Sequence, residues 1–236
     1  MKTKYELMRE AGSILREAFS LIFYNIEVGA NLEDIDLEVG HYLASYKAVS
    51  GLRVVGFPYN MCASLDYEVI QGYPNRVLQK DQIVSIDMSI LYKGVYVDKA
   101  KSISMPEASP LKVDLTDRVN GILPAIKPHL RAGIRTGYVG ELISGTLTGT
   151  SYCTCRYLGG HGIGDDLHEN PKIPNYDDGS EDILCEGQFI TIEPIIYGYP
   201  LRCLSFEDKW TITADELSAH AEDTIYIGKD FIEVLT

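Results

Sequence analysis

The sequence predicts an α+β fold with two similar halves. In each half of the chain, segments with the hydrophobic periodicity of helices come first, and segments with the alternation or apolar character of strands follow. No strong repeat of individual residues accompanies this repeated order. The 236 residues are 45% hydrophobic and contain no Pro-, Gly- or Ser-rich linker. We therefore expect residues 1–236 to form a single domain.

Two helices are expected at the start of the chain. Apolar residues recur at intervals of three and four between about Tyr5 and Tyr24, which places them along one helix face. Gly29 ends this region, and Asn31 is typical of the residue that caps a helix N-terminus. A second amphipathic helix is therefore expected to follow Asn31.

The pattern then changes to that of strands. Residues 52–55 and 61–65 are predicted as short strands that a Gly-Phe-Pro turn separates. Residues 82–91 alternate apolar and polar side chains, which places Asp87 on the polar face of a longer strand. A Lys-Gly turn leads back into a strand that carries Asp98, so the two aspartates could approach each other across a hairpin. Either aspartate alone would also fit a solvent-facing position.

The second half repeats the order of helices before strands. Helices are expected at residues 114–130, where Pro124 suggests a kink or break, and at residues 136–147. Strand-like segments follow at residues 151–157, 188–197, 210–213 and 220–227. Two of these segments contain a carboxylate among apolar residues, Glu193 and Glu222. Such carboxylates need a partner if the strands are buried.

The stretch from Leu158 to His168, which reads L-G-G-H-G-I-G-D-D-L-H, places two histidines among glycines. Gly160 and Gly162 flank His161, and glycines permit close backbone approach and unusual φ and ψ angles. The imidazole of His161 could therefore be directed at a ligand or a metal. A glycine turn with an ordinary histidine is the alternative interpretation.

The composition excludes several classes of partner. A formal net charge of −13 argues against a nucleic-acid or anionic membrane surface, because phosphate binding requires clustered Lys and Arg. Charged residues interrupt the N-terminal apolar region, and no run reaches about 18 apolar residues, so neither a signal peptide nor a membrane span is expected. The cysteines are odd in number and lack the spacing of a disulfide framework: Cys62, Cys153, Cys155, Cys185 and Cys203. We expect reduced thiols and a cytoplasmic protein.

Five candidate metal ligands interrupt the apolar pattern of different strand-like segments: Asp87, Asp98, His161, Glu193 and Glu222. Four acids buried together would repel one another and resist ionisation, and two divalent cations would relieve that repulsion. A mostly carboxylate set with one imidazole suits Mn, Fe or Co at least as well as Zn. Paired metals can activate a water for attack on an amide carbonyl, so metal-assisted hydrolysis is the implied reaction class.

These residues lie within motifs that run along nearly the whole chain. In order, the motifs are G-F-P with Phe57, I-D with Asp87 followed by Asp98, G-H-G-I-G with His161, H-E with His168, T-I-E-P with Glu193, Trp210, and Glu222 before D-T-I. Their order and spacing resemble those of the type I methionine aminopeptidases, which belong to the metallopeptidases of pita-bread fold. The resemblance implies two pseudo-symmetric halves in which helices cover an antiparallel sheet.

The resemblance also implies a role for each matching residue. Asp87 would bind one metal, Asp98 and Glu222 would bridge both, and His161 with Glu193 would complete the second. Glu193 would also handle the proton of the attacking water. His168 would hydrogen-bond the substrate near the scissile bond. A pocket for the first side chain of the substrate would be lined by Phe57, Cys62, Leu167 and Trp210, although each of these could instead be a core residue.

Two departures from the family pattern bear on activity. Gln71 occupies the place of a usual catalytic histidine, and a carboxamide cannot exchange a proton near pH 7. Leu167 and Val54 stand where bulkier aromatic residues are usual, which would reshape the substrate pocket.

Three functions are consistent with this pattern. The first is a monomeric two-metal aminopeptidase that removes Met from peptides or nascent chains. A divergent relative could instead act on another small amide, imide-like or X-Pro substrate, and a binding module on the same fold could lack catalysis. Retention of all five candidate ligands argues against the binding module, because without metals an acid cluster is only repulsive.

Overall fold

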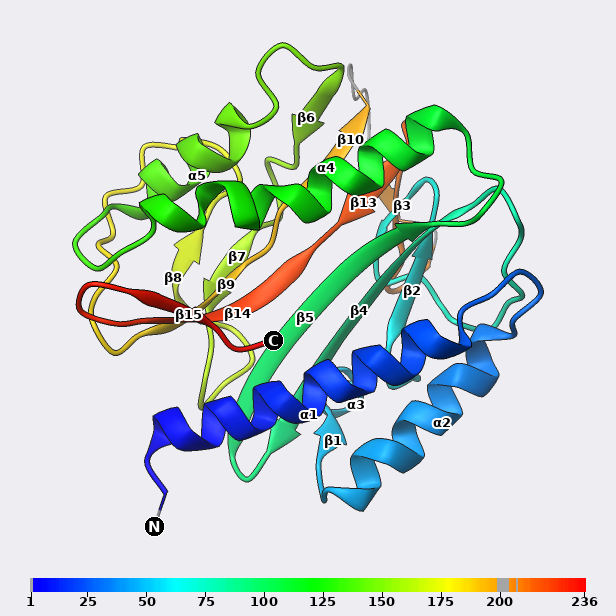
Figure 1. The fold of residues 1–236 in the computed structure, drawn as a ribbon, viewed down its shortest axis with the longest axis horizontal. Coiled ribbons are helices and arrows are strands. Elements are labelled where there is room, and N and C mark those ends of the chain that lie inside the picture. The colour runs from blue at the N-terminus through cyan, green and yellow to red at the C-terminus, as the bar shows by residue number, and fades with distance from the viewer. Residues whose placement is uncertain (1, 199–203, 207) are drawn as a thin grey trace.

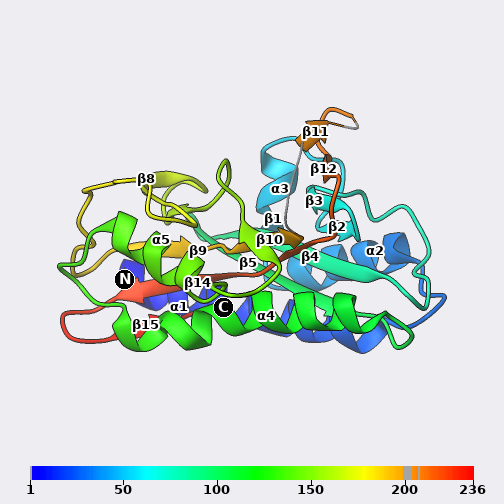
Figure 2. The same ribbon diagram turned by 90° about the horizontal axis from the view of Figure 1, so that it is seen from above.

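A computed structural model of the chain describes residues 2–198, 204–206 and 208–236, and it has the expected order of helices and strands in two halves (Figure 1). The first half begins with α1 (Lys4–Asn25) and α2 (Leu32–Ser45), and the second begins with α4 (Pro110–Ile126) and α5 (Thr136–Gly145). Figure 2 shows α1 and α4 together on one face of the central sheet. The arrangement confirms the predicted α+β class.

The central sheet has nine strands and extends through both halves. Seven form a path in the order β1 (Val49–Ser50), β4 (Ile83–Tyr92), β5 (Val95–Ser104), β14 (Glu222–Ile227), β9 (Phe189–Ile192), β7 (Gly160–Gly162) and β8 (Glu169–Ile173). Off this path, β2 (Cys62–Leu65) pairs with β4, and β15 (Ile232–Val234) pairs with β14. All of these pairings are antiparallel. The halves meet where β5 pairs with β14, with Ala100 opposite Glu222.

Two smaller sheets lie beside the central one. One has the order β13 (Ser218–His220), β10 (Ile195–Gly198) and β6 (Tyr152–Thr154), and the other has the order β11 (Leu204–Phe206), β12 (Ile212–Ala214) and β3 (Glu68–Ile70). The predicted strand at residues 188–197 is therefore two strands that belong to different sheets. The reason is Pro194, which has no N–H to continue the hydrogen-bonded ladder of β9.

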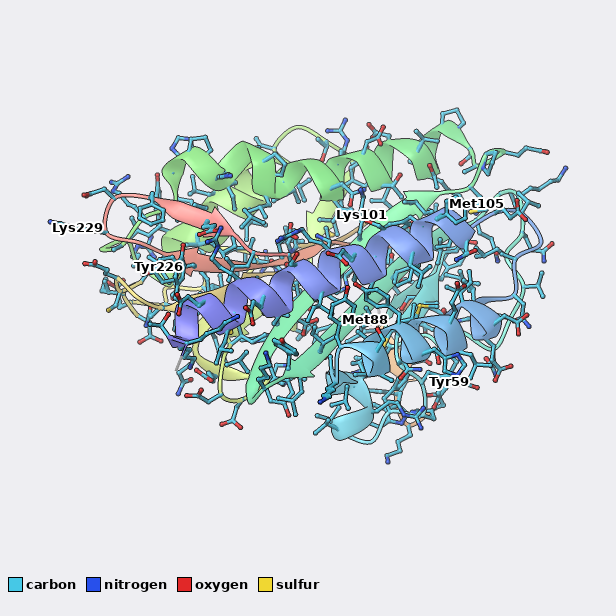
Figure 3. All side chains as sticks on the ribbon, turned by 60° about the horizontal axis from the view of Figure 1, so that its bottom comes forward. Tyr59, Met88, Lys101, Met105, Tyr226 and Lys229 are labelled. Carbon is cyan, nitrogen blue, oxygen red and sulfur yellow. The ribbon has the colours of Figure 1, made fainter. Side chains whose placement is uncertain are left out.

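Side chains that alternate along the strands separate a helix-facing side of the sheet from an opposite side. Ile86, Met88 and Val97 pack in one core cluster with residues of α1 and α2, while Ile190 and Ile225 pack in another with α4 and α5. Figure 3 looks onto the helices and places Lys101 in the gap between α1 and α4. Successive strand residues point to opposite faces. Residues 87, 98, 191 and 222 therefore lie on the face away from these helices.

Most predicted elements are present, but one predicted strand is a helix. Residues 51–54 form a short helix, α3 (Gly51–Val54), where a strand was predicted at 52–55. The hydroxyl of Ser50 accepts a hydrogen bond from the Arg53 N–H at 3.3 Å, which caps this turn of helix. Val54 and Val55 favour a strand and gave no indication of that cap. The helix expected from residue 114 begins at Pro110 because Ser109 caps it and proline is favoured in the first turn.

Two expectations from the sequence concern membrane spans and the state of the cysteines. No helix in the described ranges is both long and apolar enough to cross a membrane. Cys62 and Cys155 are buried thiols, whereas Cys203 lies outside the described residues.

Asp36 joins α2 to the segment that enters β2. It is 2% exposed, and one carboxylate oxygen accepts hydrogen bonds from the backbone N–H groups of Asn60 at 2.7 Å and Met61 at 2.9 Å. The side-chain amide of Asn60 donates to the other oxygen at 3.0 Å. Asp36 therefore fixes the chain just before the strand that carries Cys62.

We expect Asp36→Ala to lower the free energy of unfolding by about 3 kcal/mol, because it leaves buried backbone N–H groups without acceptors. Urea unfolding followed by circular dichroism measures the effect. The matched control is Asp34→Ala on the exposed side of the same helix, for which a change within about 0.5 kcal/mol is expected. Equal stability of the two variants would contradict the assigned role of Asp36.

Candidate metal centre

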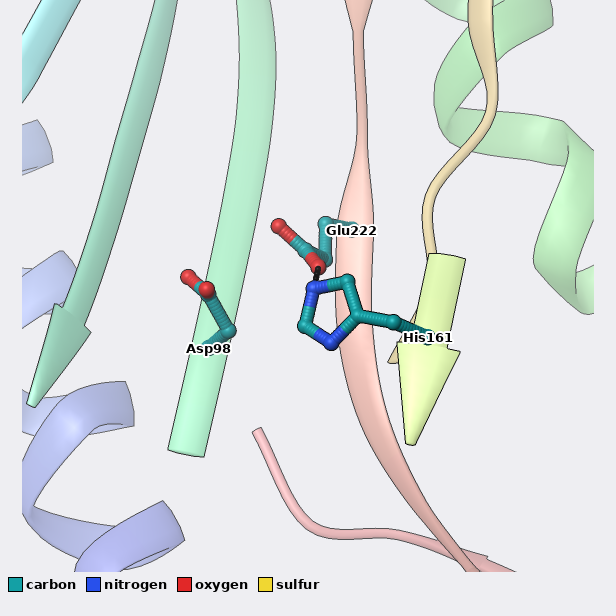
Figure 4. Close-up of side chains that lie close together, drawn as sticks. All are labelled: Asp98, His161 and Glu222. Carbon is teal, nitrogen blue, oxygen red and sulfur yellow. Dashed lines mark ion pairs between the residues drawn. The ribbon is translucent and has the colours of Figure 1, made fainter. Parts of the chain in front are cut away.

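Neighbouring strands bring the predicted acidic residues to one face of the sheet. Asp87 lies on β4, Asp98 on β5 and Glu222 at the start of β14, and these strands are adjacent in the sheet. Asp98 and Glu222 are 7% and 4% exposed, so each carboxylate is nearly removed from water. Figure 4 shows Asp98, His161 and Glu222 close together, with a dashed line for the ion pair between His161 and Glu222.

His161 is held by a strand that requires glycine on both sides. A Cβ on Gly160 would lie 2.2 Å from the carbonyl oxygen of Thr191, and one on Gly162 would lie 2.2 Å from that of Asn170. Only glycine therefore permits β7 to fit between its neighbours. Nδ1 of His161 lies 2.9 Å from the Gly162 carbonyl oxygen, which can only accept a hydrogen bond. Nδ1 thus carries the proton, and Nε2 is left as the donor atom for a metal.

Glu193 lies directly after β9, at the break before Pro194. The side-chain amide of Asn175, which is 1% exposed, donates to the Glu193 carbonyl oxygen at 2.9 Å and holds the backbone at this break. The Glu193 side chain is 14% exposed, so it lies within the acid cluster but retains contact with solvent.

Among the described residues, two groups of three side chains bring possible metal-donor atoms within 4.8 Å of one another. One group is Asp98, His161 and Glu222, and the other is Glu193, His220 and Glu222. Glu222 is common to both groups, so its carboxylate would be available to a cation at either position. His161 and Glu193 fall in different groups, whereas the sequence analysis placed them on one metal. Neither group includes Asp87.

The charges within the site explain why it needs cations. Burial raises the pKa of Asp98 and of Glu222 well above their ordinary values, and repulsion from neighbouring acids raises both further. Burial also raises the pKa of Asp87 to about 6, against the attraction of nearby His220. Oε1 of Glu222 and Nε2 of His220 are buried without hydrogen-bond partners. Unpaired donor atoms and mutually repelling acids fit bound divalent cations.

An aromatic cluster adjoins these acids through β2 and β4. Phe57 and Cys62 are buried in it, and Tyr59, Tyr73 and Trp210 pack against them. The Phe57 ring stacks on Tyr73 with centroids 5.4 Å apart and meets the Trp210 ring edge-on at 5.5 Å. Cys62 pairs with Asp87 in the sheet, and burial together with the charge of Asp87 raises the pKa of its thiol. The cluster thus places an apolar surface directly beside the acids.

Four further predicted residues lie at different depths. Leu167 is buried in the core cluster that includes α1, apart from the aromatic cluster, and Val54 is 51% exposed. His168 is exposed, and its ring meets that of His161 edge-on with centroids 4.4 Å apart. Gln71 is half-buried with φ +59°, and its carbonyl oxygen accepts a hydrogen bond from Thr211 at 3.1 Å.

His220 is a member of the site that the sequence analysis did not identify. It was included in a predicted strand, but no role was given to it. The available signal was its spacing of two residues from Glu222, since residues two apart in an extended chain point to the same side. Tyr59 and Tyr73 were missed for a different reason, because aromatic residues in loops have no periodicity from which to read a common cluster.

Comparison with known proteins agrees with this architecture. The model of metallopeptidase family M24 matches residues 6–229, and the chain belongs to this family. It is similar to a methionine aminopeptidase of Mycoplasma capricolum, with 35% identity over 235 residues that cover 97% of this chain and 94% of the relative.

Solved structures support the same relationship. The crystal structure of methionine aminopeptidase from Rickettsia prowazekii matches with a TM-score of 0.92 and 29% identity, covering 99% of this chain and 96% of that chain. The methionine aminopeptidase from Thermotoga maritima matches with a TM-score of 0.93 and 29% identity, covering 100% and 98%. A prolidase from Pyrococcus furiosus, at 18% identity and a TM-score of 0.73, shares the fold. The predicted pita-bread fold is confirmed.

Proposed function

We propose that this chain is a two-metal aminopeptidase that removes N-terminal methionine from peptides or nascent proteins. The observation that carries the proposal is the pair of three-donor groups that share Glu222, next to an apolar aromatic cluster. The similarity to methionine aminopeptidases over almost the full chain supports the choice of substrate.

The metal-binding residues in this proposal are Asp87, Asp98, His161, Glu193 and Glu222. Two divalent cations held there, drawn from Co, Mn, Fe and Zn, would supply Lewis acidity toward the scissile carbonyl and toward an attacking water. Four carboxylates balance the four positive charges of two such cations, which accounts for an otherwise repulsive buried cluster.

The protein side chains orient the substrate and move protons. Glu193 keeps solvent contact within the cluster, so it can accept the proton of the attacking water. His168 faces solvent beside His161, where its imidazole can donate a hydrogen bond to the carbonyl oxygen of the scissile bond. Phe57, Cys62 and Trp210 offer an apolar surface to the side chain of the first residue.

The direct test is release of the first residue from Met-Ala-Ser, compared with an X-Pro peptide, with Mn, Fe, Co and Zn supplied in turn to metal-free protein. We expect metal-dependent release of Met and little release of the residue before Pro. Preference for the X-Pro peptide with every metal would overturn the methionine assignment.

Gln71→His tests the departure from the family pattern. A histidine at this position can exchange protons near pH 7, so kcat on Met-Ala-Ser should rise by about 10-fold or more. Both residues have a Cβ, so the positive φ of position 71 affects them alike. The matched control is Gln79→His at an exposed position, which should leave kcat unchanged. No gain with unchanged metal content would favour a site built for another substrate.

A further inference from the structure

His220 is held rigidly at the junction of two sheets. It is 1% exposed and pairs with Ile195 at the end of β13. Its backbone N–H donates to the hydroxyl of Ser102 at 2.9 Å, and that hydroxyl lies 2.7 Å from the His220 carbonyl oxygen. The backbone of His220 is therefore held by contacts with β5 and β10.

The imidazole is directed into the acid cluster. Ala221 packs with the core beneath α4 and α5, so the residues on either side of it point the opposite way, toward the site. Nε2 of His220 lies 3.4 Å from Oε1 of Glu193 and forms no hydrogen bond. A ring nitrogen of His220 is within 4.8 Å of a carboxylate oxygen of Glu222. A buried ring nitrogen thus lies among acids, facing the Glu193 carboxylate without a regular hydrogen bond.

We propose that His220 is a sixth metal ligand, which gives each of the two cation positions one imidazole. This inference rests on the proposed two-metal function. His161 serves the position that it shares with Asp98 and Glu222, and His220 serves the position that it shares with Glu193 and Glu222. A neutral imidazole adds a donor atom without adding negative charge to the four carboxylates.

The second imidazole has a consequence for metal preference. Carboxylate and carbonyl oxygens suit Mn, Mg and Ca, whereas imidazole suits Zn, Fe and other later transition metals. With a nitrogen donor at both positions, neither position is a purely oxygen site. We therefore expect both cations to come from the imidazole-preferring metals.

Proton NMR of the Co(II)-loaded full-length protein counts the ligating imidazoles directly. A histidine bound to Co(II) through one nitrogen carries an N–H on the other, which gives a strongly shifted resonance that disappears in D₂O. We expect two such resonances in the wild-type protein, one from His161 and one from His220. A single resonance would overturn the proposal, and this result does not depend on any variant folding.

Calorimetric titration of metal-free protein with Co(II) provides the second readout. His220→Gln should weaken one of the two binding events by about 10–100-fold or more, the range found when groups that support a metal are removed. It should also remove one of the shifted resonances.

The matched control is His41→Gln, at an exposed position on α2, and it should leave both affinities nearly unchanged. Two unchanged affinities in His220→Gln would contradict the role of His220. If the wild-type protein bound no Co(II), both the two-metal function and the role of His220 would be wrong. If it bound two Co(II) ions but gave a single shifted resonance, only the role of His220 would be wrong.

Discussion

Glu222→Gln is expected to abolish binding of two cations and to lower kcat/KM on Met-Ala-Ser by about 10³-fold or more. Glu222 is the one residue that both donor groups contain, so its loss removes a ligand from each position. The remaining acids each belong to at most one group, so none of them would replace Glu222 at both positions. A bound metal contributes several kcal/mol of transition-state stabilisation, which corresponds to a rate change of this size.

Metal content after dialysis, measured by plasma emission spectroscopy, and peptide turnover should fall together. Asp98→Asn should act in the same direction, since Asp98 belongs to one group and is also buried. The matched control is Asp223→Asn, one residue further along β14, where the carboxylate forms an ion pair with Lys99 on the helix-facing side. The Asp223→Asn protein should keep both metals. Full turnover with two tightly bound metals in Glu222→Gln would refute the two-metal assignment.

The metal-free proteins provide an independent check on folding. Burial, and then repulsion from neighbouring acids, raises the pKa of Glu222, so the amide in Glu222→Gln removes a group whose charged form is unfavourable when no metal is present. Metal-free Glu222→Gln should therefore have a Tm at least as high as that of the metal-free wild-type protein. A large fall in Tm would show that Glu222 supports the fold and would weaken any conclusion from its lost activity.

The sequence revealed the sheet better than it revealed the site. Strict alternation along β4 predicted both the strand and the face on which Asp87 lies, because burial of one face imposes a period of two. Such a pattern gives no distance between strands, so it could not assign Glu193 and His161 to separate donor groups. That grouping depends on the pairing of β14 with both β5 and β9.

Residues outside regular alternation were the hardest to place. Leu167 precedes His168 in a loop, and only the tertiary structure places it in the core beside α1 and away from the aromatic cluster. His220 ends one strand two residues before Glu222 begins another, so its approach to Glu193 depends on the break at Pro194. In both cases, long-range packing decides what a side chain contacts.

His168→Ala is expected to lower kcat by about 10²–10³-fold, the effect of removing one hydrogen-bond donor that stabilises a developing oxyanion. Metal content should stay near that of the wild-type protein, because His168 belongs to neither donor group. An interaction made mainly in the transition state reduces kcat and kcat/KM together, so KM should change little. Steady-state kinetics with Met-Ala-Ser and metal analysis of the same sample measure both quantities.

The contact between the rings of His168 and His161 requires a second variant. With centroids 4.4 Å apart, loss of the His168 ring could loosen His161 and release metal indirectly. His168→Phe keeps a ring against His161 but has no N–H, so it should lose as much kcat as His168→Ala while retaining both metals. His41→Ala, at an exposed position on α2, is the control and should change neither quantity. If metal were lost in His168→Phe in proportion to activity, His168 would act on the metals and not on the substrate.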